Sequence, residues 1–384
     1  MKSEVSIMKM ASISAAGSQH NEIWETYISG KQKLTQLPFD EDELLAGTLD
    51  EKSQSLIDGV RAEEDLYNRL DDSVLYAIYV SRLVMDADGR EDTIGINFGS
   101  SRGATKSMEH HHAHFKENGH CVSMASPSTT LGNISSWVSH DLGIKGPTIS
   151  HSITCSTALH SLLNGIAWLR SGMSNRFIVG GSESAVTPFT IAQLKALRIY
   201  ANVQREYTCR PLDMTKRSNT MVLGDAAAAM LIEQGHQPQA LSYITGLGYS
   251  TEILTHSVSI STDAKCFQRS MAMCLEGMNA EDVDAIVLHA PGTIKGDQAE
   301  VLAIEKVFMG KIPALTSNKW CVGHTFGASG MMSMEMAVMM LIHNQYSPIP
   351  YLVSQKSPKR LRNIMVNAVG FGGNAVSIMV SKNN

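Results

Sequence analysis

The stretch Thr148-Ile149-Ser150-His151-Ser152-Ile153-Thr154-Cys155-Ser156-Thr157-Ala158-Leu159 places a cysteine where a predicted strand meets a predicted helix. Residues 148–153 are predicted to form the strand, and apolar residues recur at helical spacing from Thr157 to Arg170. At such a junction, unpaired backbone N–H groups and the positive end of the helix dipole favour the thiolate, which is the nucleophilic form. A buried packing cysteine is an equally good interpretation of this stretch taken alone.

Composition and charge favour a large globular protein of the reducing cytoplasm. The 384 residues suffice for one large domain or two halves, with 43% hydrophobic and 18% charged residues. We find neither a signal peptide nor an apolar run long enough to span a bilayer. The six cysteines form no CxxC pair, and the net charge of −5 argues against nucleic acid as a partner. We therefore expect a cytoplasmic protein with no metal or other cofactor and no membrane contact.

The first part of the chain is predicted to alternate strands and helices, ending near a turn-rich segment at 233–238. This turn suggests two halves, 1–235 and 236–384. The expected elements are a strand at 5–14, a helix at 22–34, surface helices and loops at 40–64, a packed helix at 66–85, a strand at 92–98, a helix at 133–142 and strands at 176–179 and 226–232.

The second part loosely repeats this plan, because Cys155 and His324 both follow a predicted strand and precede an apolar helix. Alternating strands and helices predict an α/β fold with helix-covered sheets, and the repetition suggests duplicated halves. The expected elements are a strand at 284–288, a helix at 297–308, a strand at 312–317, an apolar helix at 328–342 and strands at 364–368 and 376–380 around a glycine-rich turn at 370–373.

Two of the fourteen histidines stand at turns that follow predicted strands. His289 ends an apolar strand and enters a turn, and His324 follows Gly323. Ligands usually bind at strand ends in α/β sheets. A single histidine there is more often structural, but two of them with Cys155 at an equivalent turn favour a Cys/His/His site.

These motifs resemble, in order and over nearly the whole chain, those of the β-ketoacyl-acyl carrier protein synthases, the elongating ketosynthases of the thiolase superfamily. The resemblance implies a thiolase fold, in which duplicated halves form a five-layered αβαβα architecture. The segments that carry it are 127–130, 143–147, 154–157, 180–184, 209–213, 223–226, 289–300, 319–330 and 370–374.

The resemblance implies a decarboxylative Claisen condensation. Cys155 would accept an acyl chain from acyl carrier protein as a thioester. His289 and His324 would bind the thioester carbonyl of a malonyl-loaded carrier and stabilise the enolate that forms as CO2 leaves. The carbanion would attack the acyl group and extend it by two carbons. Oxyanion donors in a dry pocket are a large catalytic factor, which agrees with these roles.

Three further residues match positions with known roles in that family. Lys319 matches the active-site lysine, and Thr293 matches a hydroxyl that holds the pantetheine arm. The backbone N–H groups of Phe371 and Cys155 match the oxyanion hole, and the Phe371 ring matches a gate over the nucleophile. The resemblance also implies acyl- and malonyl-loaded carrier protein as partners, and a homodimer or a heterodimer with a ketosynthase-like subunit.

The chain departs from the family pattern at several positions. Pro291 replaces a hydroxyl residue after His289, and Ser333 stands where the family often has a glutamate, with Glu335 two residues further on. These differences favour a divergent member of a polyketide or polyene pathway. The alternatives are a non-catalytic chain-length-determining subunit, which usually lacks the cysteine, and a non-decarboxylating thiolase-like acyltransferase, which the paired histidines disfavour.

Three other patterns receive the simpler interpretation. The histidine-rich segment 109–114 is expected at a surface or dimer contact, because consecutive histidines cannot all face one metal ion. The methionines between 331 and 340 are expected to pack in the core, with an adaptable acyl-tunnel wall as the alternative. A basic run around Lys356 is expected to be a solvated loop, with docking of the acidic carrier as the alternative.

Overall fold

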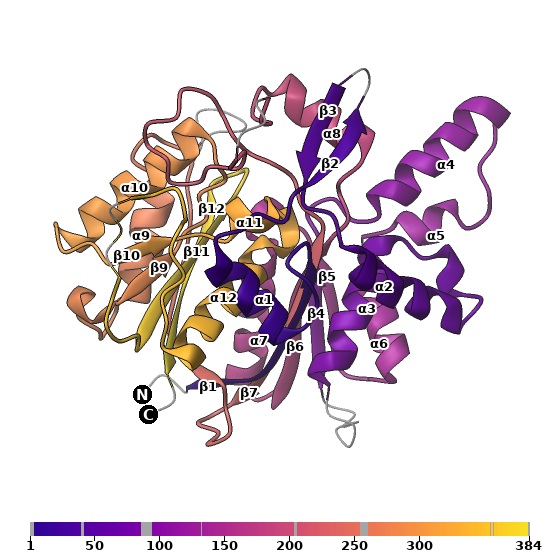
Figure 1. The fold of residues 1–384 in the computed structure, drawn as a ribbon. Coiled ribbons are helices and arrows are strands. Elements are labelled where there is room, and N and C mark those ends of the chain that lie inside the picture. Colours follow the sequence, from indigo (N-terminus) through magenta and orange to yellow (C-terminus); the bar gives the residue numbers. More distant parts are fainter. Residues whose placement is uncertain are drawn as a thin grey trace.

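The structure is a computed structural model that describes residues 4–39, 42–85, 94–131, 133–202, 206–253, 260–353, 355 and 357–382. Most of its strands join one large sheet, and β2 and β3 form a separate hairpin (Figure 1). The strands are β1 (Val5–Ser14), β2 (Thr35–Phe39), β3 (Asp42–Ala46), β4 (Gly95–Gly99), β5 (Thr148–His151), β6 (Arg176–Glu183), β7 (Ala226–Gln234), β8 (Ser242–Thr251), β9 (Ala285–Val287), β10 (Ala314–Thr316), β11 (Asn363–Gly370) and β12 (Asn374–Lys382).

Helices of different length connect these strands. The α-helices are α1 (His20–Ser29), α2 (Glu51–Glu63), α3 (Asp72–Val84), α4 (Thr105–Asn118), α5 (Ala125–Thr129), α6 (Asn133–Leu142), α7 (Thr157–Arg170), α8 (Pro188–Ala196), α9 (Lys265–Cys274), α10 (Ile294–Phe308), α11 (Lys319–Val322) and α12 (Ser329–His343). Four short 3₁₀ turns are η1 (Tyr67–Arg69), η2 (Thr154–Ser156), η3 (Ala280–Asp282) and η4 (Phe326–Ala328) among the described residues.

The large sheet consists of two halves with the same strand order. In the first half, β7 pairs antiparallel with β1 and β6, and β4 pairs parallel with β6 and β5. In the second half, β12 pairs antiparallel with β8 and β11, and β9 pairs parallel with β11 and β10. A short antiparallel contact between β1 and β8 joins them. The predicted duplicated α/β fold is therefore confirmed.

Helices cover both faces of each half and form five layers with the strands. Side chains along a strand alternate between its faces, so in β6 Ile178 packs on the side of α3 and α6, whereas Phe177 and Val179 pack on the side of α7. Helices α7 and α12 contact each other between the halves, and α9 covers β8 and β12 on the far side. These contacts give the αβαβα order of the predicted thiolase fold (Figure 1).

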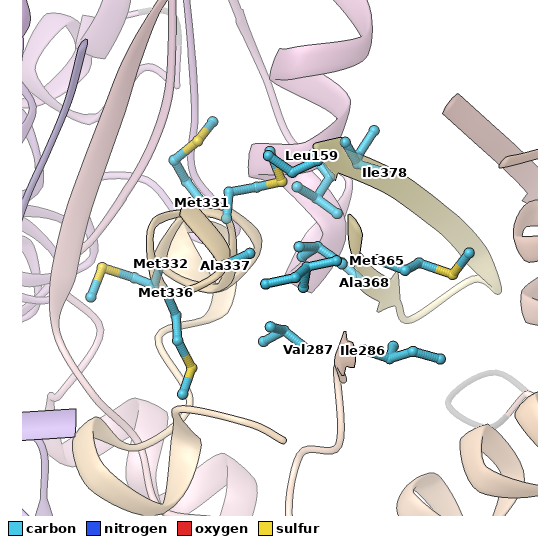
Figure 2. Close-up of a cluster of buried hydrophobic side chains, with 14 of the residues drawn as sticks. Leu159, Ile286, Val287, Met331, Met332, Met336, Ala337, Met365, Ala368 and Ile378 are labelled. Carbon is cyan, nitrogen blue, oxygen red and sulfur yellow. The ribbon is translucent and has the colours of Figure 1, made fainter. Parts of the chain in front are cut away.

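The methionine-rich helix α12 lies at the centre of the core. Figure 2 shows Ala337 directed towards Met365 and Ala368 of β11, with Met332 and Met336 on another side of the helix. Each of the six methionines between 331 and 340 is at most 2% exposed. Core packing, the simpler of the two interpretations, is confirmed.

Several local predictions need correction. The helix predicted at 22–34 ends at Ser29, because Gly30 adopts the left-handed conformation that terminates helices. Within the segment 40–64, β3 pairs with β2 in a hairpin that the sequence did not reveal. The helix predicted at 66–85 begins only at Asp72, where the Asp71 carboxylate accepts the Ser73 N–H as an N-cap.

Other predictions are confirmed or are not tested. The helices predicted at 133–142 and 157–170 have these bounds, and the apolar helix near 328–342 is α12. Residues 92 and 93 of one predicted strand, and Lys356 of the basic run, lie outside the described residues. The division into 1–235 and 236–384 stays a prediction. No helix among the described residues has the length and apolar character needed to cross a membrane.

We expect the substitution Met336→Ala to lower the free energy of unfolding by about 2–5 kcal/mol, because it opens a cavity in a close-packed core. Met336 is 0% exposed, whereas Met173 is 65% exposed. The matched control Met173→Ala should change stability by less than about 0.5 kcal/mol. Denaturant unfolding of both variants measures this difference, and equal losses would contradict the central position of α12.

Candidate active site

Cys155 lies in the tight 3₁₀ turn η2, between β5 and α7, and is 6% exposed. The preceding residue, Thr154, has φ 49, a strained conformation for a β-branched residue and one that often marks functional sites. Thr157 holds the turn closed, because its Oγ1 accepts the Ile153 N–H at 2.8 Å and donates to the Thr154 carbonyl at 2.6 Å. The polar residues around Cys155 therefore shape its turn.

The glycine-rich turn between β11 and β12 packs directly on the Cys155 turn. A Cβ atom on Gly370 would lie 2.0 Å from Thr154 Oγ1, so this contact requires glycine. Thr154 Oγ1 also donates to the Phe371 carbonyl at 3.4 Å. The Phe371 backbone thus lies beside the turn that carries Cys155, and Phe371 is 43% exposed. Its roles in an oxyanion hole and as a gate stay predictions.

The structure brings His289 and His324 together from turns far apart in the sequence. Their ring centroids are 5.2 Å apart in an edge-on arrangement. Glu300 of α10 fixes the His289 turn, since its carboxylate accepts the N–H groups of His289 and Ala290 at 3.0 and 2.8 Å. His324 is held by its own N–H, which donates to the Val222 carbonyl at 2.7 Å.

Phe326 connects this pair to Cys155. The ring centroid of Phe326 lies 5.3 Å from that of His324, and Phe326 belongs to the same buried cluster as Cys155. The turns η2 and η4, which carry Cys155 and Phe326, are also in contact. Cys155 and both histidines thus belong to one continuous set of contacts between the halves.

Lys319 is a fully buried amine, 1% exposed, whose Nζ has no hydrogen-bond partner among the described residues. Burial lowers its pKa to about 8, although the negative charge of Glu300 acts in the opposite direction. Lys319 in turn acts on Cys155, because its positive charge lowers the pKa of that thiol. The same residue influences both histidines.

Burial keeps the reactive groups uncharged. It lowers the pKa of His289 and of His324 well below the usual value, and the positive charge of Lys319 acts in the same direction. Burial and the charge of Glu183 raise the pKa of the Cys155 thiol to about 12, and Lys319 and Arg102 only partly oppose this. Burial therefore opposes the thiolate that the helix N-terminus was expected to favour, because desolvation penalises the charged form.

Thr293 lies at the entrance to α10, on the same turn as His289. Its Oγ1 accepts the Gly296 N–H at 3.2 Å and caps the helix. The hydroxyl therefore has a structural function, and its contact with a pantetheine arm stays a prediction. The Glu335 carboxylate accepts the Ser12 hydroxyl of β1 at 2.5 Å.

Sequence reasoning gave no role to three residues that shape the site, although Glu183 and Glu300 both stand within the segments 180–184 and 289–300 that carry the resemblance. Glu183, at the end of β6, accepts the N–H groups of Ser101 and Gly327 at 2.7 and 2.9 Å, and a buried acid at a strand end was a detectable signal. Glu300 was noted only as part of a motif. Arg102 lies over the Phe326 ring at 5.3 Å, and no sequence pattern indicated it.

The histidine-rich segment 109–114 lies on α4, which projects from the body of the molecule (Figure 1). Among the described residues, no group of three or more His, Cys, Asp or Glu side chains is arranged to hold a metal ion. A pocket of about 550 Å³ lies against this helix, away from Cys155. It is lined in part by Arg61, Arg69, Lys106 and His111.

Comparisons with known proteins agree with this geometry. The model of the beta-ketoacyl synthase N-terminal domain matches residues 2–237, and that of the C-terminal domain matches residues 241–352. A 3-oxoacyl-[acyl-carrier-protein] synthase 2 from Vibrio cholerae is 24% identical over 421 residues, covering 99% of both chains. Nodulation protein E from Rhizobium sp. (strain N33) is 28% identical over 246 residues, covering 62% of this chain and 57% of that protein.

Solved structures share the fold. The ishigamide ketosynthase/chain length factor matches with a TM-score of 0.88 at 17% identity, covering 100% of both chains. A beta-ketoacyl synthase from Burkholderia phymatum STM815 gives 0.87 at 22% identity, again covering 100% of both. A ketosynthase in complex with its chain length factor from Xenorhabdus doucetiae gives 0.82 at 20% identity, covering 99% of this chain and 98% of that one. With both family domains matched along the sequence, this chain belongs to the beta-ketoacyl synthase family.

Proposed function

We propose that the protein condenses an acyl thioester on Cys155 with malonyl-acyl carrier protein and releases CO2. The observation that carries this proposal is the meeting of two buried imidazoles, His289 and His324, which Phe326 links to the buried Cys155. Burial favours the neutral form of both rings. Two neutral ring N–H groups suit an oxygen atom that becomes negative during the reaction. Lys319 adds a buried amine to the same set of residues.

The first half-reaction transfers the acyl group to Cys155. The sulfur attacks the thioester carbonyl, the C–S bond to the carrier breaks, and the carrier leaves as a thiol. Because burial raises the pKa of the Cys155 thiol, its proton must move during the attack. The neutral imidazoles are the bases within the site, and the proton passes on to the departing pantetheine sulfur. The backbone N–H groups of Cys155 and Phe371 are proposed as donors to the carbonyl oxygen.

The second half-reaction forms the carbon–carbon bond. The malonyl carboxylate leaves as CO2, and its bonding electrons form an enolate whose oxygen accepts N–H groups of His289 and His324. The enolate carbon then attacks the acyl carbonyl, the C–S bond to Cys155 breaks, and the thiol regains a proton. The chain is two carbons longer. Thr293 is proposed to hold the pantetheine arm and the Phe371 ring to gate access.

Partners and setting follow from the same proposal. Related structures are ketosynthases with a carrier protein or a chain length factor, so we propose carrier protein as substrate partner and a homodimer or a ketosynthase-like heterodimer as the assembly. Relatives acting in polyketide synthesis support a specialised polyketide or polyene product. We place the protein in the cytoplasm.

A chain-length-determining subunit is the second candidate, since such subunits share this fold in the related complexes. The presence of Cys155, both histidines and Lys319 disfavours it. A non-decarboxylating acyltransferase is the third candidate. Acyl-enzyme formation and CO2 release from malonyl-carrier distinguish the three functions.

We expect Cys155→Ser to abolish formation of the acyl-enzyme, because the hydroxyl is a far weaker nucleophile than the thiol in this site. Intact-protein mass after incubation with acyl-carrier measures the adduct. The control Cys121→Ser, at an exposed cysteine, should keep it. A normal adduct in Cys155→Ser would remove Cys155 from its role, and an unmodified wild type that condenses only beside a second subunit would indicate the chain-length function.

We expect His289→Ala and His324→Ala to keep the acyl adduct but to lower condensation by about 10²–10³-fold each, because each removes one donor to the enolate oxygen. Product and CO2 release are measured from acyl-carrier plus malonyl-carrier. His112→Ala, an exposed histidine on α4, is the matched control and should behave as wild type. Unchanged condensation in both site variants would contradict the proposed reaction.

We expect alkylation of Cys155 by iodoacetamide to speed up about tenfold per pH unit from pH 6 to pH 7.5, because only the thiolate reacts and its pKa is raised to about 12. Lys319, whose pKa is about 8 and whose charge lowers that of Cys155, stays mainly charged over this range. The protonated fraction stays dominant over this whole range, so no plateau should occur. Peptide mass spectrometry follows Cys155 separately from the exposed Cys121. A plateau below pH 8 would show a resting thiolate.

A further inference from the structure

Arg102 places a positive charge close to the nucleophile, and no described carboxylate forms an ion pair with its guanidinium. The side chain is exposed, lies over the Phe326 ring at 5.3 Å and donates from Nη1 to Gln193 Oε1 at 2.6 Å. A guanidinium offers five N–H donors in a fixed fork. Most of its capacity to bind an acceptor therefore remains for a molecule that approaches this face.

Hydrogen bonds fix the backbone of Arg102, so the position of its Cα atom is defined. The Arg102 N–H donates to Glu183 Oε1 at 3.1 Å, and the neighbouring Ser101 N–H donates to Oε2 at 2.7 Å. The next residue, Gly103, donates its N–H to Ser100 Oγ at 2.9 Å. An arginine whose backbone is held in this way loses less conformational entropy on binding a ligand than an arginine on a flexible loop does.

Arg102 faces the reaction site. The ring beneath its guanidinium, Phe326, contacts His324 and shares a buried cluster with Cys155. The charge of Arg102 also lowers the pKa of the Cys155 thiol, in opposition to burial. An acyl chain on Cys155 that runs towards Phe326 would meet this guanidinium.

We propose that Arg102 determines specificity by binding an anionic or oxygen-bearing group on the acyl chain while that chain is attached to Cys155. The inference rests on the proposed function. A plain hydrocarbon chain offers a guanidinium no partner, and sites for such chains are lined by apolar side chains. A carboxylate or a carbonyl matches its donors, with a carboxylate able to form two parallel N–H···O bonds.

The carboxylate of the malonyl unit is a second possible source of the same chemistry. That carboxylate must lose its charge as CO2 leaves, so an ion pair with Arg102 would stabilise the ground state more than the transition state and slow the reaction. A charged group on the acyl chain keeps its charge throughout. We therefore assign Arg102 to the acyl chain, and the experiments below separate the two sources.

The first experiment compares two small alkylating reagents that differ in charge. Iodoacetate carries a carboxylate and iodoacetamide does not, and both react with the same thiolate. We expect the iodoacetate-to-iodoacetamide rate ratio at Cys155 to fall about 3- to 10-fold in Arg102→Met and to be largely kept in Arg102→Lys. The ratio cancels any change in the reactivity of the sulfur, and a Cys121→Ser background removes the exposed thiol.

Arg170→Met is the matched control for this experiment. Arg170 is exposed and ends α7, whose first residue follows the Cys155 turn, and a helix of 14 residues spans about 21 Å. The ratio should stay at the wild-type value in this variant. An Arg102→Met ratio equal to that of wild type would overturn the proposal, and it would do so whether or not the protein condenses acyl chains.

The second experiment uses carrier proteins loaded with adipoyl or hexanoyl groups, which have the same length but differ by a terminal carboxylate. The measured quantity is the rate of adipoyl-enzyme formation divided by the rate of hexanoyl-enzyme formation. We expect this ratio to be at least about threefold higher in wild type than in Arg102→Met. If wild type forms the hexanoyl-enzyme but its adipoyl-to-hexanoyl rate ratio equals that of Arg102→Met, only this inference is overturned. If wild type forms no adduct with either carrier, the proposed function is overturned as well. Arg102→Met could instead raise the KM for malonyl-carrier and leave the adipoyl-to-hexanoyl rate ratio unchanged. That result would show that Arg102 binds the malonyl unit and would overturn its assignment to the acyl chain.

Discussion

The buried carboxylate of Glu183 is the contact on which the candidate site depends most. It is 0% exposed and accepts four hydrogen bonds, from the Ser100 hydroxyl and from the N–H groups of Ser101, Arg102 and Gly327. A buried carboxylate costs several kcal/mol unless such donors surround it. Burial raises the pKa of Glu183 to about 7, and the donors oppose that rise. The loop after β4 and the turn η4 are thereby held together.

Duplication explains why the reactive residues meet although they are far apart in the sequence. The turns η2 and η4 are equivalent positions in the two halves, each entering a helix of the central layer, and they contact each other. Their approach needs residues without side chains. A Cβ on Gly181 would lie 2.5 Å from the Gly327 carbonyl, and one on Gly330 would lie 2.7 Å from Leu159. The first half therefore supplies the sulfur, and the second half supplies the histidines.

Much of the central fold could be predicted, because periodic apolar residues determine which helices are buried. The bounds of α6 and α7 and the position of α12 follow from this pattern, and Cys155, His289 and His324 were identified by their turns. The β2–β3 hairpin and α4 were not predicted, since neither buries a regular apolar face. The raised pKa of Cys155 was not predictable either. A helix N-terminus can be recognised in one segment of sequence, whereas desolvation depends on atoms from the whole fold.

Under the proposed reaction, the burial of the site determines the protonation states of its residues. An enolate carbon that forms beside an imidazolium would take up its proton and be quenched before it reached the acyl group. Burial and the charge of Lys319 keep His289 and His324 neutral, so each ring donates an N–H to the enolate oxygen without being acidic enough to protonate the carbon. The same desolvation favours the thiol form of Cys155. Under this proposal, burial suppresses two side reactions, alkylation of the resting sulfur and protonation of the carbanion. It also requires that each proton be transferred between groups within the site.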